Sequence, residues 1–194
     1  MIRLAIFVSG SGTNCENLLR HFSTFDQVQP TLVLSNRADA YALQRAARFD
    51  VPTEVVDRKT FYDERALTEL LQRYGVDFIV LAGFLWMAPD FLVDQYEGRM
   101  INLHPALLPK YGGRGMYGHH VHEAVKAAGE RETGMTVHYV SRVCDGGEII
   151  AQFSTPLAPD DTADDIAAKE HELEQEHFPQ VVEDVLRKTF PSEF

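Results

Sequence analysis

Short apolar runs rich in β-branched and aromatic residues alternate along the chain with longer segments of helical spacing. The apolar runs occupy residues 4–8, 31–34, 53–56, 78–82 and 100–103. The intervening segments that place apolar residues on one helical face are residues 14–22, 38–49 and 61–74. Runs without a polar face are typical of parallel strands covered on both sides. The pattern therefore predicts an α/β fold, a Rossmann-like open sheet that is mostly parallel with helices on both faces.

The pattern changes after residue 130. Residues 135–140 and 148–153 are predicted to be a pair of antiparallel strands around a turn at Asp145-Gly146-Gly147. A closing helix is predicted to begin near Thr162, a suitable N-cap, because Asp164 and Asp165 then lie in the first turn. We find no repeat, low-complexity segment or linker. Residues 1–194 are therefore expected to form a single domain.

Composition and charge narrow the possible functions. The 194 residues are 45% apolar and 24% charged, which is typical of a globular protein with one full core. A formal net charge of −11 argues against nucleic acid and anionic membranes as partners. No apolar segment approaches the roughly 18 to 20 residues of a transmembrane helix, and no signal peptide is visible. The two cysteines are far apart, so we expect reduced thiols in a cytoplasmic protein, either a monomer or a homodimer.

Ser9-Gly10-Ser11-Gly12-Thr13-Asn14 follows the first predicted strand and opens the first helix. Ligands of open α/β sheets bind outside the carboxyl ends of the strands, and helix N–H groups there can hold an anion. The third glycine of a dinucleotide fingerprint is missing, and the second strand ends in Ser35-Asn36 without a ribose-binding carboxylate. No Gly-Lys-Ser/Thr follows either. The loop favours a single phosphate of a small substrate over a merely structural turn.

Asn102 and His104 come at the end of a predicted strand, and strand alternation places them on the same side. An amide donor beside an imidazole can bind an oxyanion and move a proton, as acyl transfer requires. Taken alone, a histidine at a strand end is more often structural. Asp145 can pair with an imidazole and raise its pKa, or simply form a hairpin turn. Sequence spacing does not show that Asp145 meets His104.

Two other features, a histidine cluster and an aromatic pair, allow either a structural or a functional interpretation. The cluster His119-His120-Val121-His122-Glu123 lacks the HExxH spacing, so a polar helix start is favoured over a metal site. Trp86 and Met87 follow the fourth predicted strand, where they either line a pocket for a flat ligand or belong to the core. Both interpretations stay open.

These motifs together resemble the phosphoribosylglycinamide formyltransferase family, folate-dependent enzymes of purine biosynthesis, over nearly the full chain. The motifs that carry the resemblance occur in the family's order and at about its spacings. They are Ser9 to Asn14, Ser35-Asn36-Arg37-Ala38-Asp39-Ala40, Leu81-Ala82-Gly83-Phe84, Asn102-Leu103-His104-Pro105-Ala106-Leu107-Leu108-Pro109, and Asp145-Gly146-Gly147. The resemblance implies a single formyltransferase domain over residues 1–194.

The resemblance also implies a role for each matching position. Asn102 and His104 act on the formyl carbon, and Asp145 holds and charges His104. Contacts with the ribonucleotide are implied for Gly12, Thr13, Asn14, Gly83, Pro105 and Glu174. Contacts with the folate are implied for Lys59, Leu85, Trp86, Met87, Ala88, Asn102, Val140 and Ser141. The implied reaction transfers the formyl group of 10-formyltetrahydrofolate to the amine of N1-(5-phospho-D-ribosyl)glycinamide in de novo purine (IMP) biosynthesis, and no metal is needed.

Three other functions are weighed against this one. Related hydrolases that release formate usually carry an additional N-terminal domain, whereas this chain begins on the first strand. Methionyl-tRNA formyltransferases carry a basic tRNA-binding domain, whereas this chain is acidic. A non-catalytic nucleotide-binding module would leave the Asn-x-His-Pro and Asp-Gly-Gly motifs unexplained.

The sequence departs from the family pattern at two places. Several carboxylates lie close to Glu174, and any of them could align with the family's ribonucleotide-binding carboxylate. The segment from Gly112 to His120 is longer than in some members of the family.

Overall fold

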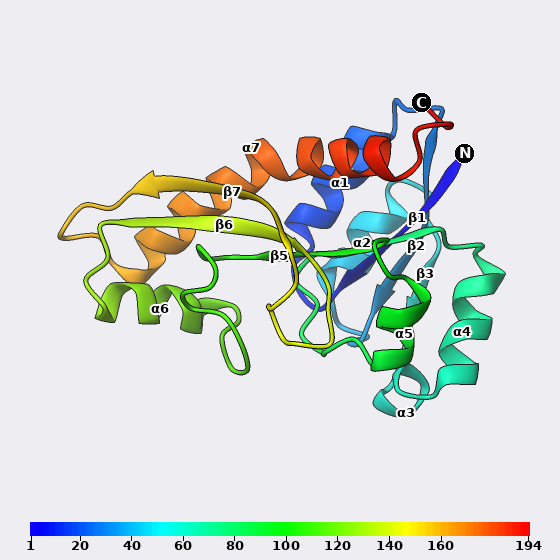
Figure 1. Cartoon of the computed structure of the whole chain (residues 1–194), viewed down its shortest axis with the longest axis horizontal. Coiled ribbons are helices and arrows are strands. Elements are labelled where there is room, and N and C mark those ends of the chain that lie inside the picture. Colours follow the sequence, from blue (N-terminus) through cyan, green and yellow to red (C-terminus); the bar gives the residue numbers. More distant parts are fainter.

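The computed structural model describes all residues from 1 to 194, and its centre is one mixed sheet (Figure 1). The strands lie in the order β3-β2-β1-β4-β5-β6-β7. The parallel strands are β1 (Ile2–Val8), β2 (Val28–Ser35), β3 (Thr53–Val55), β4 (Phe78–Leu81) and β5 (Met100–His104). The antiparallel strands are β6 (Glu132–Tyr139) and β7 (Ile149–Pro156). The predicted α/β fold with a mostly parallel sheet is confirmed.

Helices cover both faces of this sheet. The helices on one face are α1 (Thr13–Phe22), α2 (Tyr41–Ala47) and α7 (Ala163–Thr189). Those on the other are α3 (Arg58–Phe61), α4 (Glu64–Arg73) and α5 (Asp90–Gln95). The remaining helix, α6 (His119–Ala127), packs against α7. In β1, Leu4 and Ile6 belong to the first core and Ala5 and Phe7 to the second, because successive strand side chains point to opposite faces.

Element boundaries differ from the predicted ones where a polar side chain caps the backbone. The predicted helix over residues 61–74 corresponds to α4, which begins at Glu64 because Asp63 accepts a hydrogen bond from the Ala66 N–H. The short helix α3 precedes it and shares only Phe61 with the predicted range, and its N-cap Asp57 accepts a hydrogen bond from the Thr60 N–H. The closing helix begins as predicted, with Thr162 and Asp165 forming a capping box. The loop that carries Asp145 is close to the predicted one, since β6 ends at Tyr139 and β7 begins at Ile149, where the strands were expected to end at residue 140 and resume at residue 148.

The sheet has its topological switch point at β1. The chain passes from β1 to β2 on one side and returns to β4 on the other, so the loops after β1 and β4 diverge above a crevice. Ser9 ties these two loops together, because its hydroxyl accepts a hydrogen bond from the Leu85 N–H and donates one to Asn36.

No helix in the structure is both long enough and apolar enough to cross a membrane.

Candidate active site

A cavity of about 960 Å³ opens at the carboxyl ends of the strands. It is lined by the loops that follow β1, β4 and β5, by the segments around residues 113–119 and 140–145, and by one face of α7. The cavity lining includes most of the site residues expected from the sequence. They are Gly12, Thr13, Asn14, Gly83, Leu85, Trp86, Met87, Ala88, Asn102, His104, Pro105, Val140, Ser141, Asp145 and Glu174.

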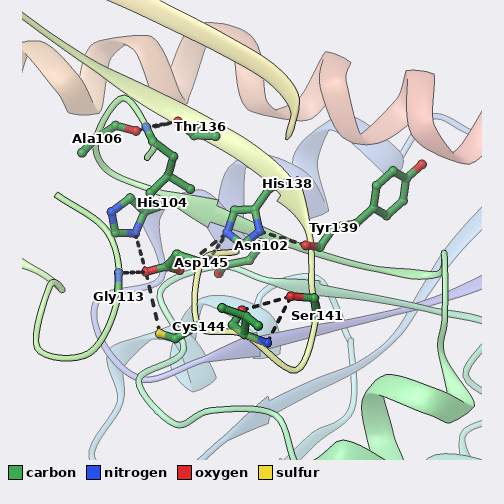
Figure 2. A network of polar contacts seen from close by, with 12 residues as sticks. Asn102, His104, Ala106, Gly113, Thr136, His138, Tyr139, Ser141, Cys144 and Asp145 are labelled. Atoms are coloured by element: carbon green, nitrogen blue, oxygen red, sulfur yellow. Dashed lines mark hydrogen bonds and ion pairs between the residues drawn. The ribbon is translucent and has the colours of Figure 1, made fainter. Parts of the chain in front are cut away.

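Asp145 lies between two histidines in the middle of this cavity (Figure 2). Its Oδ2 is 3.6 Å from His104 Nδ1, and its Oδ1 is 3.6 Å from His138 Nε2. Asn102 Nδ2 is 3.1 Å from the same His138 nitrogen. The structure thus brings Asn102, His104 and Asp145 together and adds His138 to them.

The tautomer of each ring follows from its backbone contact. His104 Nε2 lies 2.7 Å from the carbonyl oxygen of Tyr111, which can only accept, so Nε2 carries the proton. In the neutral ring, Nδ1 therefore keeps its lone pair and faces Asp145. His138 Nδ1 likewise donates to the Tyr139 carbonyl, at 2.9 Å, which leaves Nε2 to accept the Asn102 N–H. Asn102 is thereby oriented with one amide hydrogen still unused.

Burial decides the charge of His104. Desolvation lowers the pKa of His104 below its ordinary value, although the nearby Asp145 carboxylate acts to raise it. Asp145 does act to raise this pKa, as its motif predicted, but burial outweighs it. Burial also acts to raise the pKa of Asp145, yet contacts with His138 and with the Gly113 N–H together lower it. Both shifts favour a neutral His104 imidazole beside an Asp145 carboxylate.

His138 is the site residue that the sequence analysis missed. It is a buried polar residue in β6, flanked along the strand by the core residue Val137, and it pairs across the sheet with Asn102. A polar residue inside an apolar strand was a visible signal. The antiparallel register that places it opposite Asn102 was not visible, because sequence does not give strand register directly.

The loop after β1 has the backbone expected of an anion site. Gly12 is the N-cap of α1 and adopts a left-handed conformation with φ of 76°, and no side chain caps the helix. Asn14 donates from Nδ2 to Glu174 at 2.7 Å, and His171 Nδ1 lies 3.0 Å from the same carboxylate oxygen. The predicted loop residues and Glu174 therefore meet at one end of the cavity, although 160 residues separate Asn14 from Glu174.

Replacing Gly12 by Ala is expected to lower the free energy of unfolding by about 2 to 5 kcal/mol, from the left-handed backbone and from overpacking. A Cβ at this position would lie 2.4 Å from the Cβ of Ala42 in α2. Chemical denaturation measures the loss. Gly10 is the matched control, because a Cβ there meets nothing within 4 Å. Equal stability of the two alanine variants would contradict this packing.

The other end of the cavity has an aromatic wall. Trp86 packs against Phe61 and Tyr62, with ring centroids 5.5 and 6.2 Å apart. Leu85 and Met87 stay 48% and 37% exposed in the cavity wall, which suits an apolar ligand. Lys59 is exposed on α3 and does not line the cavity. Its neighbour Arg58 lies over the Tyr62 and Trp86 rings instead.

The histidine cluster at residues 119–122 begins a helix, as predicted. His119 Nε2 is 3.8 Å from Glu123 Oε1 and 3.6 Å from Asp164 Oδ1, and these side chains are half or more exposed. No group of three or more His, Cys, Asp or Glu side chains is placed to hold a metal ion.

The fold and the site define an acyl-transfer class, and comparison with known proteins narrows it. The family model described as formyl transferase matches residues 2–182, so this is a formyltransferase. A phosphoribosylglycinamide formyltransferase of Haemophilus influenzae is 35% identical over 94% of this chain and 86% of that protein. The trifunctional purine biosynthetic protein adenosine-3 of Drosophila melanogaster is 37% identical, but the match covers 14% of its length.

Solved structures agree with the sequence comparison. The phosphoribosylglycinamide formyltransferase of Anaplasma phagocytophilum matches with a TM-score of 0.87 and 33% identity, covering 96% of this chain and 88% of that one. The enzyme of the same name from Streptococcus pneumoniae matches with a TM-score of 0.83 and 34% identity, covering 96% and 99%. The chain belongs to the phosphoribosylglycinamide formyltransferase family.

Proposed function

We propose that this protein transfers the formyl group of 10-formyltetrahydrofolate to the primary amine of glycinamide ribonucleotide, a step of de novo purine biosynthesis. The observation that carries the proposal is the cluster of Asn102, His104 and Asp145 midway along one cavity. An anion-binding loop lies at one end of that cavity and an aromatic wall at the other. The two ends match a phosphorylated amine and a flat folate.

Binding sets up the reaction. The phosphate is held by backbone N–H groups at Gly12, Thr13 and Asn14, where the helix N-terminus favours an anion. The folate ring lies against Trp86 and Val140. This arrangement places the amine and the formyl carbon beside Asn102 and His104, and orienting two reactants in this way is itself a large part of catalysis.

The chemical step then follows from the tautomers. The amine nitrogen bonds to the formyl carbon, and the carbonyl electron pair moves onto oxygen, where the unused Asn102 N–H stabilises it. The amine proton passes to His104 Nδ1, the ring nitrogen with a free lone pair, and Asp145 stabilises the imidazolium formed. When the carbon–nitrogen bond to the folate breaks, its electron pair stays on that nitrogen, which takes the proton from His104. A neutral resting imidazole suits this role as base.

The test of the proposal is amine-dependent turnover. The protein is mixed with 10-formyltetrahydrofolate, and formation of tetrahydrofolate is followed by absorbance with and without glycinamide ribonucleotide. We expect turnover only when the amine is present. Equal turnover without the amine would identify a formyl-folate hydrolase, and ribonucleotide binding without turnover would identify a non-catalytic nucleotide-binding module.

A further inference from the structure

Two buried polar atoms in the cavity wall have no hydrogen-bond partner. They are Nδ1 of His122 on α6 and Oε1 of Glu170 on α7. His122 is 6% exposed and Glu170 is 3% exposed, and both line the cavity. Buried polar groups in folded proteins are nearly always hydrogen-bonded. Two such groups on facing helices of one cavity therefore point to a ligand that supplies the missing partners.

The surroundings of both groups favour their neutral forms. Burial lowers the pKa of His122, and the neighbouring His119 and His104 lower it further against the opposing influence of Glu174. Burial and the adjacent Glu174 carboxylate raise the pKa of Glu170 well above its ordinary range. A neutral imidazole and a protonated carboxyl can each donate and accept. They suit a neutral polar group better than a phosphate or an ammonium.

The positions of His122 and Glu170 indicate which part of the ribonucleotide they contact. His122 lies on α6, which packs against α7, and Glu170 lies one helical turn before Glu174 on α7. Both line the cavity that forms the path from Glu174, at the phosphate end, to His104, at the reacting centre. In glycinamide ribonucleotide, that path holds the ribose and the amide that joins it to the glycyl amine. The amide lies next to the amine and presents one acceptor and one donor on opposite sides. The ribose presents only hydroxyls.

We propose that His122 and Glu170 bind the amide of glycinamide ribonucleotide, with His122 donating to its carbonyl oxygen and Glu170 accepting from its N–H. Both are positioning residues, which hold the amine beside His104. This inference rests on the proposed function.

The test uses His122→Phe and Glu170→Leu, which keep side-chain bulk but remove the polar atoms. Each is expected to raise the Kd for glycinamide ribonucleotide about tenfold, the usual effect of one hydrogen bond to a buried group. The inhibition constant of ribose 5-phosphate, which shares the phosphate but lacks the amide, should stay within about twofold. The KM for 10-formyltetrahydrofolate should not change. Glu170→Gln keeps a neutral oxygen acceptor and should lose less affinity than Glu170→Leu.

The melting temperatures of the variants distinguish a role in ligand binding from a role in the stability of the fold. Because an unpartnered buried polar atom destabilises the fold, both variants should melt at the same temperature as the wild type or higher. Thr133→Val is the matched control, since Thr133 Oγ1 is also buried without a partner but lines a different cavity. It should melt no lower and bind the ribonucleotide normally. Unchanged ribonucleotide affinity in His122→Phe, or an equal loss of ribose 5-phosphate, overturns the assignment. Failure of the wild type to use the ribonucleotide would instead overturn the proposed function.

Discussion

Asp145→Asn is expected to lower kcat by about two to four orders of magnitude, the range that positioned acid–base catalysis supplies. The carboxylate is the only charge that stabilises a proton on His104 Nδ1, 3.6 Å away. Without it, the pKa of His104 falls further below its ordinary value, and the imidazole becomes a weaker base. Steady-state kinetics with both substrates saturating measure the loss. The acid limb of the kcat profile should also move to lower pH, because the imidazole stays neutral to lower pH.

The fold and the ribonucleotide affinity of this variant should be preserved. Asp145 also accepts a hydrogen bond from the Gly113 N–H at 2.9 Å, and an amide oxygen can still accept it. Circular dichroism and the Kd for the ribonucleotide are the controls. A kcat close to that of the wild type would reduce Asp145 to a residue of the loop between β6 and β7.

Asn102→Ala is expected to lower kcat by about two to three orders of magnitude, while the KM for the ribonucleotide should change little. The amide N–H binds the oxygen only once negative charge develops on it, so its loss is felt in the transition state. Asn17→Ala is the matched control, because Asn17 also donates from Nδ2, at 2.9 Å to the Gln175 carbonyl, but does not line the cavity. It should leave kcat unchanged. A kcat for Asn102→Ala equal to that of this control would remove Asn102 from the mechanism.

The fold was predictable because the apolar runs are strong signals. The run at residues 78–82 is buried on both sides of the sheet, and its short length, its β-branched residues and the flanking Gly75 and Gly83 identify it as a strand. The helix α3 was not predicted because its four residues are too few to give a periodic signal. The predicted start of α4 is three residues early, because Asp63 is the N-cap and the helix begins at Glu64. The short helix α5 has too few turns to give a periodic signal.

The site was predictable only in part. Strand alternation places Asn102 and His104 on one side, and the loop after β1 follows the rule for carboxyl ends of strands. The approach of Asp145 depends on a loop conformation with φ of 53° at a non-glycine residue, which no spacing encodes. The direction in which the pKa of His104 shifts could not be predicted from the sequence, because desolvation lowers this pKa and the Asp145 carboxylate raises it.

Histidine titration by NMR tests the central claim, that His104 and Asp145 form one proton-transfer pair. In the free wild-type protein, we expect the pKa of His104 to lie below the ordinary value for histidine, as burial dictates. In Asp145→Asn, we expect the pKa to fall further, since the only neighbouring carboxylate has lost its charge. A pKa of His104 that stays the same or rises in the variant would contradict the pairing.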